Sequence, residues 1–184
     1  MINYFSIIQK YVPLESDFYR IYVIHVTLVT NKALSIARRL NLSAESLQFI
    51  EEAGMLHDIG IVKVKSEKFK AHNGSELPYI AHGTQGAEIL RAEGLPQHAR
   101  VAERHTGVGI TQKEIEERNL PLPHQDFVPE TIEEEIISYA DLFFSKRESI
   151  LWQEETPEQI RAELAQYGEE QVTKFDEWQQ RFGG

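Results

Sequence analysis

His57 and Asp58 stand next to each other at the end of a largely apolar segment, residues 49–56, that contains Ala and Gly. An imidazole and a carboxylate are costly to bury in such a place unless a partner compensates them. A divalent metal ion is one such partner. The chain has no cysteine, so any metal must be held by His, Asp and Glu, a ligand set that suits Fe, Mn, Co, Ni, Zn or Mg.

Further His and Asp residues fall on the predicted inward faces of other helices. His25 lies on the apolar stripe of a helix expected over residues 15–40. Asp141 stands between two apolar residues, one helical turn away on either side. A carboxylate in that setting is rarely buried without a partner.

Two more histidines lie at predicted helix ends. His82 begins a helix, where the helix dipole disfavours the imidazolium and keeps a nitrogen lone pair free. His105 ends a helix beside a Gly-rich loop, which would leave room for a substrate. His98 shares a face with His105 and is a competing candidate. His72 and His124 lie in irregular segments and are expected at the surface.

Each of these residues also has a purely structural interpretation. A lone histidine on an apolar stripe, such as His25, is more often a core residue than a ligand. Asp141 could cap a neighbouring helix, and His57 with Asp58 could stabilise a helix end through the dipole. These interpretations weaken when taken together, because three separate helices each turn a His or Asp inward.

The rest of the chain predicts an all-α fold. Most segments have helical periodicity, and none indicates a set of alternating strands. There is no internal repeat or low-complexity linker, so we expect a single domain over residues 1–184. Capping boxes are predicted at Thr111, Thr131 and Thr156. Helices are expected over about 2–11, 15–40, 44–58, 82–94, 96–105, 111–119, 131–144, from 156, and 169–182.

Composition limits the possible partners. The 184 residues are 41% hydrophobic and 26% charged, which is typical of a globular protein. A formal net charge of -10 argues against a nucleic acid polymer as the partner. No apolar run is long enough to span a membrane, and the N-terminus lacks the apolar core of a signal peptide. We therefore expect no membrane association and a cytoplasmic location.

His25, the pair His57-Asp58 and Asp141, in that order and on helices, resemble the motif of the HD-domain phosphohydrolase superfamily. The run His57-Asp58-Ile59-Gly60 has the form for which the HDIG subgroup is named. Residues 81–90 and 103–111 also look like stretches of small HDIG proteins. The likeness covers roughly residues 20–145. It implies a helical bundle of the HD-domain type, with C-terminal helices at about 150–184 packing on that metal-binding core.

The resemblance also implies a ligand set and one or two divalent metal ions. In relatives with two extra histidines, a second ion is often bound and the Asp of the His-Asp pair bridges both ions. By position, His82 and His105 would be those extra ligands here. The residues implied to hold the first ion are His25, His57, Asp58 and Asp141.

The implied reaction is hydrolysis of a phosphate ester or anhydride by water whose pKa a metal ion lowers toward ~7. Asp58 and Arg104 are the residues expected to be catalytic. The acidic net charge favours a small phosphorylated substrate, such as a nucleotide or dinucleoside polyphosphate. Lys63, Lys65 and Lys68 could bind its phosphate oxygens, although a solvated loop face is the commoner role for such lysines.

The chain departs from the cyclic-dinucleotide phosphodiesterase branch of the superfamily. It lacks that branch's Gly-Tyr-Pro stretch, has Ile61 where a Lys usually follows the HDIG run, and has Arg104 where a His would precede His105. We therefore do not expect a cyclic dinucleotide as the substrate.

Two other functions stay open. One is a catalytically inactive HD-type module that binds a nucleotide and regulates a partner. The other is an interaction protein that docks through its C-terminal aromatic stripe, Phe175, Trp178 and Phe182. Such a stripe more often packs in a core or in a homodimer, and a homodimer is possible here.

Overall fold

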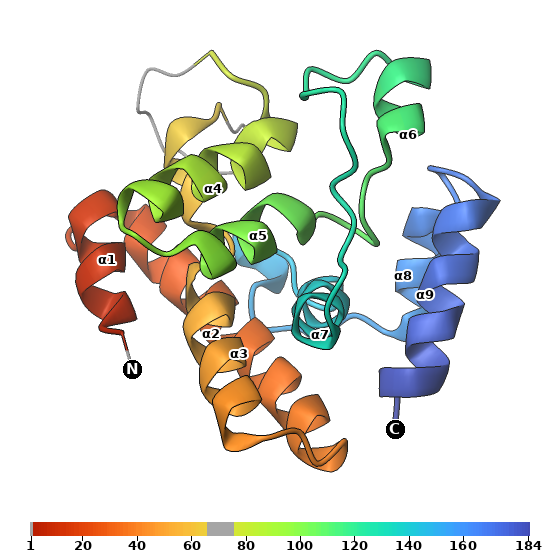
Figure 1. The fold of residues 1–184 in the computed structure, drawn as a ribbon, viewed down its shortest axis with the longest axis horizontal. Coiled ribbons are helices and arrows are strands. Elements are labelled where there is room, and N and C mark those ends of the chain that lie inside the picture. Colours follow the sequence, from red (N-terminus) through yellow and green to blue (C-terminus); the bar gives the residue numbers. More distant parts are fainter. Residues whose placement is uncertain (1, 66–75) are drawn as a thin grey trace.

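The computed structural model describes residues 2–65 and 76–184 (Figure 1). Its regular elements are helical, and the only β-structure within those residues is two isolated bridges, Ile110 with Phe127 and Phe144 with Glu154. The predicted all-α class is confirmed. No helix in these ranges is long and apolar enough to cross a membrane.

The helices follow the predicted order, with most boundaries within a few residues of expectation. The α-helices are α1 (Tyr4–Tyr11), α2 (Asp17–Arg39), α3 (Ala44–Leu56), α4 (His82–Ala92), α5 (Pro96–Arg104), α6 (Gln112–Glu117), α7 (Ile132–Asp141), α8 (Pro157–Leu164) and α9 (Glu169–Phe182). The short 3₁₀ helices are η1 (Ile59–Lys63), η2 (Tyr79–Ala81) and η3 (Glu148–Ile150).

Polar side chains determine where several helices begin. Ser43 caps α3, and Thr111 and Thr156 form complete capping boxes at α6 and α8, as predicted. The box predicted at the start of α7 is only half formed. Thr131 accepts a hydrogen bond from the Glu134 amide, but the Glu134 carboxylate accepts the N–H of Glu130 instead of that of Thr131. The prediction there was wrong because the Glu134 carboxylate is held by other partners.

The core is built along α2, the longest α-helix. It packs against α3 and α7, while α4 packs against α5 and η1 (Figure 1). Buried residues form two clusters, and α2 contributes to both. Tyr22 and Val26 belong to the first cluster and Val29 to the second. His25 is buried on α2 between Tyr22 and Val26, one turn before Val29.

Of the two C-terminal helices, α9 packs on α7, and α8 packs on α9. Phe175, Trp178 and Phe182 are all buried in the second cluster. Tyr139 of α7 stacks on Phe175, with ring centroids 5.9 Å apart, and its hydroxyl donates to Gln179 of α9. The aromatic stripe therefore forms intramolecular core and is not an exposed docking surface. That the whole chain is one domain stays a prediction.

Gly60 lies against the first turns of α4. A Cβ placed on Gly60 would be 2.0 Å from the carbonyl oxygen of His82 and 2.1 Å from the amide nitrogen of Gly86. No side chain fits between these backbone atoms. Glycine at this position therefore lets the turn after Asp58 approach the helix that starts with His82.

We predict that Gly60→Ala lowers the free energy of unfolding by about 3 kcal/mol or more, because backbone atoms must move to admit the methyl group. Gly54→Ala in α3 is the matched control. Its added Cβ would meet chiefly the Thr30 side chain, at 2.6 Å from Oγ1, and alanine favours a helix by about 1 kcal/mol. Urea unfolding followed by circular dichroism measures both. Equal midpoints for Gly60→Ala and the parent chain would contradict this account of the turn.

Candidate metal centre

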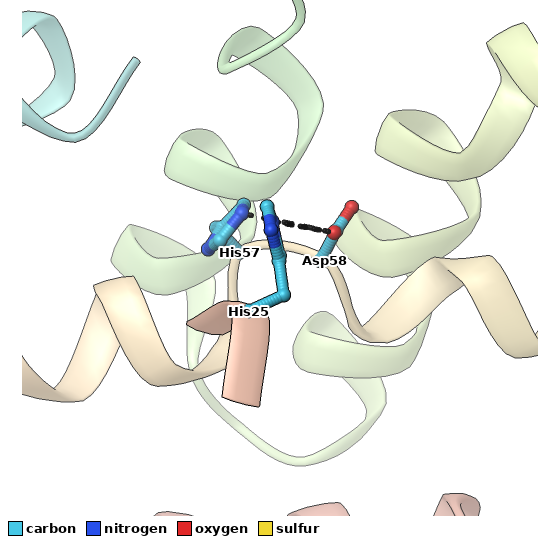
Figure 2. A group of neighbouring side chains, drawn as sticks. All are labelled: His25, His57 and Asp58. Atoms are coloured by element: carbon cyan, nitrogen blue, oxygen red, sulfur yellow. Dashed lines mark ion pairs between the residues drawn. The ribbon is translucent and has the colours of Figure 1, made fainter. Parts of the chain in front are cut away.

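Residues from five separate parts of the chain converge in the interior between α2, α4, α5 and α7. The four histidines and Asp58 among them are at most 3% exposed. The side chain of Asp141, the sixth residue, is 15% exposed. Figure 2 shows three of them, His25, His57 and Asp58, with their side chains directed toward one another. The converging residues are His25 of α2, His57 and Asp58 after α3, His82 at the start of α4, His105 after α5, and Asp141 at the end of α7.

A sharp turn lets two neighbours in sequence face the same point. The α3 helix ends at Leu56, earlier than the predicted residue 58. His57 closes the helix and Asp58 departs from helical geometry, with φ -102° and ψ 7°. As a result, His57 Nε2 lies 3.8 Å from Asp58 Oδ2.

The two oxygens of Asp58 face two different groups of histidines. Oδ2 lies 3.4 Å from His25 Nε2 and 3.8 Å from His57 Nε2. Oδ1 lies 3.5 Å from His82 Nε2 and 3.6 Å from His105 Nε2. The carboxylate thus stands between the two groups.

Asp141 faces the first of these groups. Its Oδ1 is 3.0 Å from His25 Nε2 and 3.4 Å from His57 Nε2. Three sets of residues bring ligand atoms within 4.8 Å of one another, each spacing one that a metal ion could bridge. The sets are His25, His57 and Asp58; His57, His105 and Asp141; and Asp58, His82 and His105.

Backbone carbonyls orient three of the four histidine rings. In each, Nδ1 contacts the carbonyl oxygen three residues earlier: His57 to Gly54 at 2.7 Å, His82 to Tyr79 at 2.8 Å, and His105 to Ala102 at 2.8 Å. A carbonyl only accepts hydrogen bonds, so we assign the proton to Nδ1, which leaves a lone pair on Nε2 of the neutral ring. Metal-binding histidines commonly use this arrangement.

The inward-facing atoms lack partners that would satisfy them. His82 Nε2 and His105 Nε2 are 3.0 Å apart, and two lone pairs at that distance repel unless a cation or a proton lies between them. Within the described part of the chain, His25 Nε2, His57 Nε2 and Asp58 Oδ1 are buried without a hydrogen bond, which is rare in folded proteins. Nitrogen and carboxylate donors in this arrangement fit a divalent metal ion.

The environment acts differently on the imidazoles of the site. Burial lowers the pKa of His25 and of His82 to about 4 in each case, so both rings are neutral at pH 7. Burial also acts to lower the pKa of His57, but its contact with Asp141 and the charges of Asp58 and Asp141 outweigh burial and raise it.

The carboxylates remain ionised because a cation lies beside them. Burial acts to raise the pKa values of Asp58 and Asp141, but the charge of Lys146 and the neighbouring histidines hold both well below the ordinary value. Lys146 Nζ is 2.6 Å from Asp58 Oδ2 and 3.9 Å from Asp141 Oδ1, and its side chain is 13% exposed. Lys146 was not among the site residues predicted from the sequence, where its only signal was a lysine five residues after Asp141, following the apolar residues 142–144.

A cavity of about 370 Å³ adjoins the cluster. His82, His105 and Asp141 line it, together with Lys146 and Arg147. The other walls come from Tyr79, the loop 106–110, α6 and the C-terminal helices. A molecule in this cavity would lie directly beside the candidate ligands.

The remaining histidines lie elsewhere. His98 Nε2 is 3.3 Å from Glu52 Oε2, and its ring packs edge-on against Phe49. His105, and not His98, therefore reaches the cluster. His124 is exposed, as predicted, and His72 lies outside the described residues.

The cations expected from the sequence are not among the described residues that line the cavity. Arg104 Nη1 pairs with Glu130 Oε1 at 2.8 Å. Lys63 is exposed, and Lys65, also exposed, pairs with Glu76. Lys68 lies outside the described residues. Catalysis by Arg104 and phosphate binding by the lysines stay predictions.

Several known proteins are similar to parts of this chain or to most of it. The family model described as "HD domain" matches residues 22–144. A tRNA (cytidine(56)-2'-O)-methyltransferase of Thermoplasma volcanium is 34% identical over 122 residues, which are 66% of this chain and 31% of that protein. The uncharacterized protein MJ0778 of Methanocaldococcus jannaschii is 40% identical over 107 residues, 56% of this chain and 54% of that protein. The chain thus spans about half of MJ0778 and a third of the methyltransferase.

Two crystal structures of the HD domain of the Listeria monocytogenes phosphodiesterase PgpH have a similar fold. The first has a TM-score of 0.55 and 17% identity, and covers 97% of this chain and 85% of that one. The second, a complex with cyclic-di-AMP, has a TM-score of 0.54 and 18% identity, and covers 94% and 82%. At this identity, the likeness shows the fold alone.

We predict that, in chelator-treated protein, the free energy of unfolding falls as the pH is lowered from about 7 to about 4. The pKa values of His25 and His82 are about 4 in the folded chain against 6.5 otherwise, so the unfolded state binds more protons in this window. The raised pKa of His57 acts oppositely, because its contribution is lost as the pH rises through the folded value. Urea unfolding at several pH values measures the slope. A His82→Gln variant with an undiminished slope would contradict the assignment.

Proposed function

Because this chain belongs to the HD domain family, we propose that it is a metal-dependent phosphohydrolase acting on a phosphate ester or anhydride of a small molecule. The observation that carries the proposal is the buried Asp58 carboxylate between two groups of histidine nitrogens. Placement in the HDIG subgroup is part of the same proposal and rests on the run from His57 to Gly60.

We assign the ligands by the oxygen of Asp58 that each group faces. Asp58 would help to hold a first ion with the residues near Oδ2 and a second ion with those near Oδ1. A divalent ion of Fe, Mn, Co, Ni, Zn or Mg supplies Lewis-acid chemistry here, since it lowers the pKa of water and neutralises charge on phosphate oxygens. The proposed ligands are His25, His57, Asp58 and Asp141 for the first ion, and Asp58, His82 and His105 for the second.

Other residues would bind and orient the substrate. Lys146 and Arg147 line the cavity beside the cluster, where they can meet phosphate oxygens. Arg104 joins Glu130 at the start of α7 to the end of α5, and so can hold the adjacent His105 in place. Lys63 and Lys65 do not line this cavity, so phosphate binding by them would need a part of the substrate that extends beyond it.

A nucleotide-sized substrate is consistent with the cavity. Its volume of about 370 Å³ falls in the range of small-molecule sites. The PgpH HD domain was crystallised with cyclic-di-AMP, which supports a nucleotide ligand for this fold. Because Ile61 and Arg104 depart from the cyclic-dinucleotide branch, we propose a linear nucleotide or dinucleoside polyphosphate, hydrolysed in the cytoplasm, and not a nucleic acid polymer.

The methyltransferase names of two relatives do not carry over to this chain. The matched segment is 31% of the T. volcanium protein and 24% of a second such enzyme, from Picrophilus torridus, which is 38% identical over 95 residues, 51% of this chain. In our chain the family match at residues 22–144 contains the His-Asp cluster. We propose that methyl transfer in those relatives belongs to the part outside the match.

The alternative is a catalytically inactive HD-type module that binds a nucleotide and regulates a partner. Such a module would need the cavity to bind its nucleotide, but it would not need the buried histidines and aspartates that could hold a metal ion. The convergence of four histidines and two aspartates, with lone pairs directed inward, favours an enzyme over a remnant site.

We predict that the wild-type chain binds divalent metal and releases phosphate from at least one nucleotide or dinucleoside polyphosphate when Mn, Fe, Co or Mg is added. Asp58→Asn should lower metal content and cut the rate at least about a hundredfold, because even indirect partners of metal ligands are worth ten- to a hundredfold. His98→Gln removes a buried histidine outside the cluster and should keep both.

Metal content by mass spectrometry and phosphate release measure these effects. If Asp58→Asn retained full metal content and rate, the proposed site would be wrong. Metal and nucleotide binding without turnover on the whole panel would favour the regulatory module.

A further inference from the structure

Lys146 occupies a particular place between the cluster and the cavity. It follows α7, lines the cavity wall, and keeps its side chain largely buried. Its Nζ is 2.6 Å from Asp58 Oδ2, the same oxygen that faces His25 and His57. The lysine and the first group of histidines therefore face the same carboxylate oxygen.

A metal ion and the Lys146 ammonium would compete for that oxygen. A metal-bound carboxylate oxygen lies about 2.0–2.2 Å from the ion. With Nζ 2.6 Å from the same atom, the ion and the ammonium would be no more than about 4.8 Å apart. Like charges at that separation repel strongly in a buried site. An ammonium also has no lone pair with which to bind a metal.

The cavity offers Lys146 a second position. Its four-carbon stem is flexible, and the cavity beside it measures about 370 Å³. An ammonium displaced from Asp58 would enter the space where a substrate phosphate bound at the cluster presents its oxygens. Asp141, 3.9 Å away, would be engaged by the metal as well. Glu114, Glu155 and Glu163 also line the cavity, but a phosphate held at the cluster would be the anion that adjoins Lys146 and the metal together.

We propose that Lys146 is an exchangeable counter-ion. It neutralises Asp58 until a divalent metal ion binds, and then turns into the cavity to bind the phosphate group of the substrate. The inference rests on the proposed function, because it requires the metal site. It makes Lys146 a substrate-binding residue that is available only after metal has bound.

A purely structural lysine would behave differently. If Lys146 only stabilised the buried carboxylates, its removal would change the stability and the metal affinity but leave phosphate binding unaltered. Measuring the two affinities separately therefore distinguishes the two roles without relying on turnover.

The experiment uses isothermal titration calorimetry with two probes, Mn²⁺ on chelator-treated chain and inorganic phosphate on Mn²⁺-loaded chain. Lys146→Met should bind Mn²⁺ about tenfold tighter or better, and bind phosphate at least about tenfold more weakly. Lys146→Arg should regain most of the phosphate affinity. Lys174→Met is the matched control and should match wild type. Lys174 also pairs with carboxylates, Glu135 and Glu177, but does not line the cavity.

Circular dichroism and thermal melting check that each variant folds. If Lys146→Met does not fold, Lys146→Gln takes its place. A dissociation constant for either probe that stays within about twofold of wild type overturns the exchange. A wild-type chain that binds no Mn²⁺ and none of the other divalent ions overturns the proposed function, and the exchange with it. If the wild-type chain binds metal but Lys146→Met does not show the expected changes in affinity, only the exchange is overturned and the proposed function stands.

Discussion

A fully buried carboxylate with a histidine group on each side is the constraint on which the rest of this structure depends. Asp58 has no exposed surface, and an ionised carboxylate in such a place needs compensation from several directions. The histidine nitrogens and the Lys146 ammonium surround it. The packing of α2, α4, α5 and α7 can be understood as the arrangement that delivers those groups to one carboxylate.

One repeated backbone contact positions the histidine rings around Asp58. Three histidines follow or close a helical turn and contact the carbonyl three residues earlier. Each ring is thereby held by its own segment, without help from a distant side chain. Gly60 then lets the segment carrying His57 and Asp58 press against the helix carrying His82. Local geometry and close backbone approach together place nitrogen atoms from different helices within a few ångströms of one another.

The sequence was most informative where a property is local. Helical periodicity and capping residues predicted the order of the helices, and the family motif predicted that His25, His57-Asp58 and Asp141 would converge. It was least informative where tertiary packing decides. Nothing in the periodicity separates His98 from His105. They are seven residues apart, on α5 and directly after it, but they meet different neighbours. Lys146 was not predicted because its partner, Asp58, is distant along the chain. The capping role predicted for Glu134 was wrong because the Glu130 amide and Arg100 hold its carboxylate.

Two stretches of the chain form the cavity wall, one within the family match and one beyond it. The family match covers residues 22–144, which carry all the candidate ligands, whereas Ile160, Leu164 and Tyr167 of the opposite wall lie beyond it. Substitutions at these three positions can reshape the chamber without replacing any of the candidate ligands. The shape of the chamber can therefore change at residues 160–167 while the buried histidines and carboxylates keep their packing.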